Sequence, residues 1–171
     1  MAEHARKKPS TAKGARQDRG GMRLLVVEAR FYEEIGAALA EGAVAELAAQ
    51  DIGFDVVSVP GALEIPQVLA KAVATGALGG PSARYQGVVV LGCVIRGETS
   101  HYDIVCNNAN HWLMEVAIRH AVPVGNAILT VDTEAQALAR AKGGRQGKGA
   151  DAVRACLALI DAAAALTREP R

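Results

Sequence analysis

The stretch GCVIRGETSHYD (Gly92–Asp103) contains Thr99, Ser100 and His101 in succession. It continues directly from a strongly apolar run, GVVVLG (Gly87–Gly92). A glycine followed by hydroxyl residues at a helix start offers unpaired backbone N–H groups, and the helix dipole favours an anion such as phosphate there. The commoner alternative is an ordinary helix N-cap by Thr99 or Ser100. Glu98 would repel an anion unless its carboxylate points away. The stretch is therefore a candidate phosphate site that needs support from other residues.

His101 is a candidate acid–base group, because a neutral imidazole both accepts and donates protons near pH 7. It falls in the first turn of a predicted helix, where Asp103 could orient it. The alternative is a surface histidine without a chemical role, which is the usual case for a lone histidine. His4, His111 and His120 are interpreted in that second way, since one lies in the N-terminal segment and two lie within or at the end of a helix.

Four further side chains could bind a substrate. Phe31 could stack on a planar heterocycle, and Glu64 could accept hydrogen bonds from a polyol. Arg140 and Lys148 could pair with a phosphate. Each has a plainer alternative: a core or interface aromatic, a carboxylate that stabilises a helix start, or a solvated cationic surface. Taken singly, the plainer alternatives are favoured, so a functional role depends on the fold bringing these residues together.

The elements that must position these groups alternate between strands and helices. Apolar runs predict strands at Met22–Ala29, Phe54–Gly61, Gly87–Gly92 and Val124–Val131. Helical spacing predicts helices over Phe31–Gln50, from Leu63 to near Gly76, over Tyr102–Ala121, from a Thr133/Gln136 capping box through Ala141, and over Ala150–Thr167. This alternation is typical of βαβ units, and ligands of such parallel sheets bind beyond the carboxyl ends of the strands. The candidate residues follow those strand ends.

Composition and charge limit the classes of function. A chain of 171 residues with half of them apolar predicts one domain, which we place at residues 22–171. A net charge of +1 gives no general case for a nucleic-acid partner. Basic residues crowd residues 1–21, which are predicted to be a disordered tail and, lacking an apolar segment, no secretory signal. No run is long enough to span a membrane.

The three cysteines do not indicate a metal site. Cys93, Cys106 and Cys156 fit no zinc spacing, and each falls in an apolar or helical context. We expect buried free thiols, which suit a reducing cytosol and predict a cytoplasmic location.

Five segments together resemble one family, the lumazine synthases. They are ARFYEEI, VPGALEIP, VLGCVIRGETSHYDIV, PVGNAILTVDTEAQALARA and GKGADAV, and the resemblance covers about Arg23 to Leu166. It implies a flavodoxin-like three-layer α/β sandwich with a four-stranded parallel sheet. It also implies a transferase of riboflavin biosynthesis that condenses 5-amino-6-(D-ribitylamino)uracil with 3,4-dihydroxy-2-butanone 4-phosphate, releasing phosphate and water, and that uses no cofactor or metal.

The resemblance also implies a role for each matching residue. Phe31 would stack on the pyrimidine, Glu64 would bind the ribityl chain together with Ala62 and Leu63, and His101 would transfer protons. The other implied site residues are Cys93, Val94 and Ile95 in the ring pocket, Glu98 and Thr99 as backbone donors to the phosphate, Arg140 and Lys148 as its cations, and Asp151 as a partner of a cation. Two positions depart from the common pattern: Asn126 stands where many members carry a pocket-wall phenylalanine, and Tyr32 where asparagine is usual.

The family resemblance further implies a homo-oligomer. Its members form pentamers with active sites between adjacent subunits, and some pentamers assemble into icosahedral shells; the loop from Arg140 to Lys148 is compatible with a shell. The segment before Met22 would then add a strand to a neighbouring subunit. Two alternatives are a non-catalytic flavin or lumazine binder, or shell protein, and a phosphate-binding domain holding FMN. The presence of His101, Arg140 and Lys148 favours the enzyme, and a flavodoxin would be more acidic and richer in aromatic residues.

Overall fold

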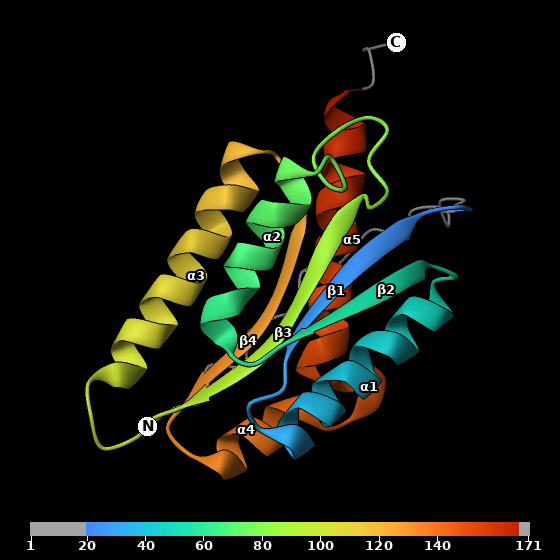
Figure 1. Cartoon of the computed structure of the whole chain (residues 1–171). Coiled ribbons are helices and arrows are strands. Elements are labelled where there is room, and N and C mark those ends of the chain that lie inside the picture. The colour runs from blue at the N-terminus through green and yellow to red at the C-terminus, as the bar shows by residue number, and fades with distance from the viewer. Residues whose placement is uncertain (1–19, 168–171) are drawn as a thin grey trace.

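The computed structural model describes residues 20–167, which form a four-stranded parallel sheet covered by helices on both faces (Figure 1). The strands are β1 (Arg23–Ala29), β2 (Gly53–Val59), β3 (Gly87–Ile95) and β4 (Val124–Val131), in the order β2-β1-β3-β4. The helices are α1 (Glu33–Ala49), α2 (Ile65–Ala74), α3 (His101–Arg119), α4 (Glu134–Ala141) and α5 (Lys148–Leu166), with short 3₁₀ turns η1 (Ala62–Glu64) and η2 (Gly144–Gln146). The predicted three-layer α/β fold is confirmed.

The two central strands are apolar on both faces because each face is covered by helices. Leu24 and Val26 of β1 pack with α1, α4 and α5, whereas Leu25 and Val27 pack with α2 and α3. β3 is buried from Gly87 to Cys93. This double burial explains the continuous aliphatic run that the sequence shows, since a strand buried on both sides has no reason to alternate.

Helix α5 approaches α1 and β4 at backbone distance, and glycines make this possible. A Cβ on Gly149 would lie 1.9 Å from the Leu39 carbonyl oxygen of α1, and a Cβ on Gly125 would lie 1.9 Å from the Ala152 carbonyl oxygen. Both are far below van der Waals contact, so these glycines fix how closely the layers pack.

Several element boundaries differ from those predicted. β3 continues three residues beyond Gly92, because Cys93, Val94 and Ile95 pair with β4. The first helix begins at Glu33 rather than Phe31, and the last begins at Lys148 rather than Ala150. The predicted helix from Leu63 is divided into η1 and α2.

Two predictions about side chains are only partly right. The Thr133 hydroxyl accepts the Gln136 N–H at 3.3 Å, but the Gln136 amide oxygen accepts from the Asp132 N–H rather than from that of Thr133. The reciprocal capping box is thus displaced by one residue. All three cysteines are free, with Cys93 and Cys156 buried and Cys106 only half-buried.

Some predictions fall outside the described residues. They include nearly all of the basic tail 1–21, the strand expected from it and the last four residues of the predicted domain 22–171. None of the helices in residues 20–167 combines the length and the hydrophobicity that a membrane-spanning segment requires.

Candidate active site

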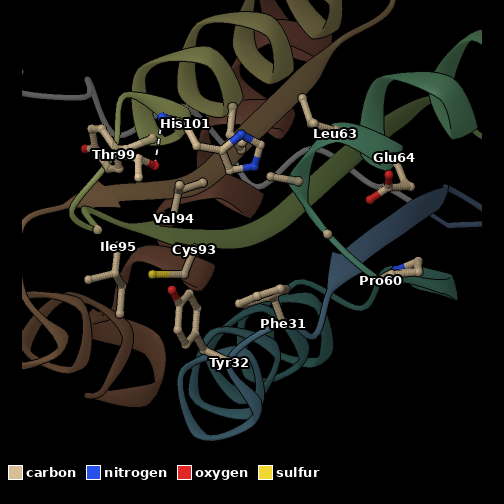
Figure 2. Close-up of a pocket in the computed structure, with 15 residues that line it drawn as sticks. Phe31, Tyr32, Pro60, Leu63, Glu64, Cys93, Val94, Ile95, Thr99 and His101 are labelled. Atoms are coloured by element: carbon tan, nitrogen blue, oxygen red, sulfur yellow. Dashed lines mark hydrogen bonds between the residues drawn. The ribbon is translucent and has the colours of Figure 1, made fainter.

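A cavity of about 370 Å³ opens beyond the carboxyl ends of β1, β2 and β3 (Figure 2). Its lining residues are Phe31, Tyr32, Pro60, Gly61, Ala62, Leu63, Glu64, Cys93, Val94, Ile95, Gly97, Thr99, His101, Tyr102 and Val105. The lining comes from four segments: the connection after β1, the turn after β2, the last residues of β3, and the loop that leads into α3 together with the first residues of that helix. The cavity is therefore at the edge of the sheet where ligands of parallel α/β folds bind.

The cavity brings together nine of the residues that the sequence singled out. They are Phe31, Ala62, Leu63, Glu64, Cys93, Val94, Ile95, Thr99 and His101. Glu98, Asn126, Arg140 and Lys148 are not among its lining residues. One chain thus gathers the expected ring, polyol and proton-transfer residues, but not the expected phosphate cations.

Two aromatic rings stand side by side at one wall of the cavity (Figure 2). Phe31 is 72% exposed, as expected for a ring available for stacking. The Tyr32 ring contacts it edge-on, with centroids 5.0 Å apart. The sequence showed Tyr32 only as a departure from the usual asparagine, and its adjacency to Phe31 was the one available signal.

The start of α3 presents His101 to the cavity. His101 is the first residue of the helix, and its backbone N–H lies 3.4 Å from the Thr99 hydroxyl oxygen, which accepts it. Ser100 occupies the N-cap position without a side-chain cap bond within the described chain. The Thr99 hydroxyl thus contacts the backbone at the start of α3.

Asp103 pairs with Arg96 at 3.5 Å rather than with His101, so the expected orienting role for Asp103 is not supported. Arg96 also binds Asp132 at 3.0 Å and stacks over the Tyr102 ring, 4.1 Å from its centroid. Arg96 therefore links the loops that follow β3 and β4 to α3. Sequence analysis missed this arginine, although it lies within the quoted stretch.

Burial keeps the Cys93 thiol neutral. Desolvation, with a smaller contribution from Cys106, raises the pKa of Cys93 to about 11. A thiol with this pKa is almost entirely protonated at pH 7, so Cys93 can form part of the wall but is a poor nucleophile.

The cationic candidates lie on the segment from α4 to α5. Arg140 is exposed in the last turn of α4, and its guanidinium donates to the Gln136 carbonyl oxygen at 2.9 Å. Lys148 opens α5 and pairs with Asp151 at 2.9 Å. Burial by itself would raise the pKa of Asp151, but hydrogen bonds from Lys148 and Arg154 outweigh it and lower the pKa below its usual value. Asp151 therefore pairs with cations, as expected.

Asn126 is exposed on β4 and is held by its own chain. Its amide nitrogen donates to the Asn110 side chain at 2.8 Å, and its amide oxygen accepts the Ile128 N–H at 2.8 Å. Asn126 therefore does not line the cavity of the single chain.

The described residues contain no group of His, Cys, Asp or Glu side chains arranged to hold a metal ion. The cavity offers instead an exposed aromatic ring, a carboxylate, an imidazole and a helix start. A three-layer α/β fold with such a cavity defines a domain that binds, or acts on, a small polar molecule carrying a planar ring.

Comparison with known proteins gives the family. A family model described as 6,7-dimethyl-8-ribityllumazine synthase matches residues 21–164. A protein of that name from Nitrobacter hamburgensis is 50% identical over 145 residues, covering 85% of this chain and 88% of the relative. One from Methylobacterium radiotolerans is 51% identical over 140 residues, covering 82% and 81%. The chain belongs to the 6,7-dimethyl-8-ribityllumazine synthase family, which confirms the resemblance seen in its sequence.

Proposed function

We propose that this protein is a 6,7-dimethyl-8-ribityllumazine synthase, which condenses 5-amino-6-(D-ribitylamino)uracil with 3,4-dihydroxy-2-butanone 4-phosphate. The observation that carries the proposal is the single cavity in which Phe31, Glu64 and His101 meet. A planar pyrimidine fits against the exposed Phe31 ring. A ribityl chain extends toward the turn that carries Glu64, whose carboxylate accepts hydrogen bonds from hydroxyl groups.

The proposed reaction requires proton transfer at each of its steps. The 5-amino group attacks the ketone carbon, and the resulting carbinolamine loses water to give an imine. Phosphate then leaves as a neighbouring carbon loses a proton, and the resulting enol becomes a ketone. The ribitylamino nitrogen attacks this ketone carbon, and loss of a second water completes the lumazine. We assign these proton transfers to His101, which begins α3 at the edge of the cavity. Much of the acceleration comes from holding the two substrates together.

We assign the phosphate to the backbone N–H groups at Glu98 and Thr99, with Arg140 and Lys148 as its cations. Both cations lie outside the cavity of the single chain, and so does Asn126. We infer that an adjacent copy brings them to the cavity, in a pentamer or a pentamer-based assembly. Analytical ultracentrifugation tests this, because a pentamer, a decamer and a 60-subunit shell differ widely in mass, and a monomer would contradict it.

Three free cysteines support a reducing compartment, and we place the protein in the cytoplasm. Neither a membrane nor a nucleic acid has a place in the proposed reaction.

The experiment that tests the function is turnover of the two substrates by the purified protein without added metal, followed by lumazine fluorescence. His101→Ala should lower kcat by about 10²-fold or more, since general acid–base catalysis typically contributes 10²–10⁴-fold. His120→Ala, at the exposed end of the same helix, is the matched control and should retain activity. A wild-type protein that binds the lumazine but forms none would be a binder, and the proposal would be wrong.

Arg140→Ala tests the phosphate assignment. It should raise KM for the butanone phosphate while leaving KM for the pyrimidine nearly unchanged, because it removes one cation from the anion. Unchanged kinetic constants for both substrates would remove Arg140 from the site.

A further inference from the structure

Glu46 is a carboxylate buried in the interior, with 1% of its surface exposed, on the face of α1 that packs against the core. Its oxygens accept three hydrogen bonds: from Gln50 at 3.0 Å, from Arg145 at 2.9 Å and from Arg154 at 2.8 Å. Burial raises the pKa of Glu46, but the bonds from Arg145 and Gln50 and the nearby charges outweigh burial and lower it. A buried charge is tolerated only with such partners, so this group has a specific structural task.

The two arginines that Glu46 binds belong to the segment between Arg140 and Lys148 and to the helix that follows it. Arg145 lies in η2, and Arg154 lies in α5. Arg154 also donates to the Arg145 carbonyl oxygen at 3.0 Å. The loop backbone is close to α1 as well, since a Cβ on Gly42 would lie 2.7 Å from the Gly144 carbonyl oxygen. Glu46 thus fastens this loop and the start of α5 to the same point of α1.

The contacts continue from Glu46 to Lys148. The second terminal nitrogen of Arg154 donates to Asp151 at 2.6 Å, and the other oxygen of Asp151 accepts from Lys148 at 2.9 Å. Side-chain exposure rises along this path, from 1% at Glu46 to 52% at Lys148. The guanidinium of Arg154 is planar, and its two terminal nitrogens point in fixed directions. It therefore holds the Glu46 and Asp151 carboxylates in one relative geometry. A chain of charges therefore runs from the core to the surface lysine.

We propose that Glu46 is a positioning residue for the phosphate cations: through Arg154 and Asp151 it sets the place of Lys148, and through Arg145 it fixes the loop between Arg140 and Lys148. The inference rests on the proposed function, in which Arg140 and Lys148 serve the phosphate. Within residues 20–167, the Lys148 ammonium group donates one hydrogen bond, to Asp151. An ammonium group has three donors, so two of them can still bind an anion.

The test is Glu46→Gln, which keeps the shape of the side chain and removes its charge. It should raise KM for the butanone phosphate about 10-fold, because Arg140 and Lys148 are no longer held in position for the phosphate. KM for the pyrimidine should stay within about 2-fold of wild type. The matched control is Asp55→Asn. Asp55 is also held by two arginines, Arg23 and Arg84, but at the amino-terminal edge of the sheet, away from the cavity. It should lower thermal stability without changing either KM.

A second variant keeps the test decisive if Glu46→Gln does not fold. Arg154→Met removes the link between Glu46 and Asp151, together with the bond to the Arg145 carbonyl oxygen, and leaves the bond between the Arg145 guanidinium and Glu46 in place. It should raise the same KM, and the double variant should be no worse than the poorer single variant, because both changes interrupt one path. If the folded variants show the same pair of KM values as Asp55→Asn, Glu46 is a brace for stability alone and the inference is overturned.

Orthophosphate separates this inference from the proposed function. An anion that binds the native cations raises the midpoint of thermal unfolding. We expect this rise in wild type and Asp55→Asn, and its loss in Glu46→Gln and Arg154→Met. A wild type that makes no lumazine but shows this pattern would overturn the function and retain the positioning role. If the wild type makes lumazine, but Glu46→Gln and Arg154→Met keep both KM values and are still stabilised by orthophosphate, the proposed function stands and the positioning role is overturned.

Discussion

At the scale of single residues, Tyr32 shows a competition between folding and binding. It occupies the N-cap of α1, yet within the described chain its side chain makes no cap hydrogen bond. Asparagine, aspartate, serine or threonine there would typically stabilise the helix by about 1 kcal/mol. The Tyr32 ring instead lines the cavity against Phe31 and packs on the core. Tyr32 therefore leaves α1 without a side-chain cap but gives the cavity a second aromatic ring.

This argument predicts a split between stability and binding. Tyr32→Asn and Tyr32→Ala both remove the ring, but only asparagine can cap α1, so Tyr32→Asn should be more stable than Tyr32→Ala by about 1 kcal/mol in urea unfolding. Both should raise KM for the pyrimidine about 3- to 10-fold, since an aromatic contact is worth roughly 0.5–1.5 kcal/mol. Tyr32→Phe keeps the ring and should change neither quantity strongly. Equal stability of the Asn and Ala variants would contradict the capping argument.

The same residues show how far the sequence could predict the site. Phe31, Glu64 and His101 were candidates because each lies just beyond a predicted strand end or near a helix start. Taken singly, the plainer alternatives were favoured, and the resemblance of five segments to one family supplied their roles. The partner of Asp103 was not visible, because the choice between His101 and Arg96 depends on where the loops after β3 and β4 meet. Side-chain pairing across loops is set by the fold and not by spacing.

At the scale of elements, the length of β3 shows a similar limit. The apolar run predicted an end at Gly92, but pairing with β4 continues through Ile95 opposite Val131. β3 ends where its pairing partner β4 ends, and the residues of β3 alone do not indicate where β4 ends. The consequence matters for the site, because Cys93, Val94 and Ile95 become strand residues with fixed directions rather than parts of a loop.

The contact between α1 and α5 can be tested at one glycine. Gly149→Ala would place a Cβ 1.9 Å from the Leu39 carbonyl oxygen, and neither backbone can move without separating the two helices. We expect a loss of about 3 kcal/mol or failure to fold, at the upper end of overpacking effects, measured by urea unfolding. Gly80→Ala, where the structure shows open space around the new Cβ, is the control and should stay close to wild type. A stable Gly149→Ala protein would refute the close packing described above.

The amino-terminal edge of the sheet is held by Asp55, and its stability should depend on pH. Hydrogen bonds from Arg23 and then Tyr85 hold the pKa of Asp55 well below its ordinary value near 3.8. The folded protein therefore favours the charged form, which stabilises it at neutral pH, and this stabilisation fades as pH falls below about 4. Asp55→Asn should unfold at lower urea than wild type at pH 7.

The difference between Asp55→Asn and wild type should stay constant down to about pH 5 and shrink at lower pH. Glu41→Gln, an exposed carboxylate on α1, is the control and should change little across this range. A difference that grows as the pH falls would contradict the assigned direction of the pKa shift.

At the scale of the whole molecule, the single chain holds two incomplete halves of the proposed site. The cavity carries the ring-binding and proton-transfer residues, whereas the cations and Asn126 lie elsewhere on the chain. Large apolar side chains are also exposed on α3, including Trp112 at 52% and Ile118 at 75%. Such exposure on one helix is typical of a surface that contacts another protein. Both features favour a closed ring of copies in which each cavity is completed by its neighbour.

Complementation between two impaired variants tests that arrangement directly, when activity is assayed at a butanone phosphate concentration far below the raised KM of Arg140→Ala. If a site takes His101 from one copy and Arg140 from the next, co-expressed His101→Ala and Arg140→Ala chains form rings in which some sites receive both native residues. With equal expression and random head-to-tail assembly, about one site in four is native, so activity should recover to about a quarter of wild type. If both residues of a site come from one chain, no mixed ring contains a native site, and activity stays at the level of the separate variants. Co-expression of His101→Ala with Lys148→Ala should recover activity in the same way, because Lys148 belongs to the same half of the site as Arg140, whereas Arg140→Ala with Lys148→Ala should not.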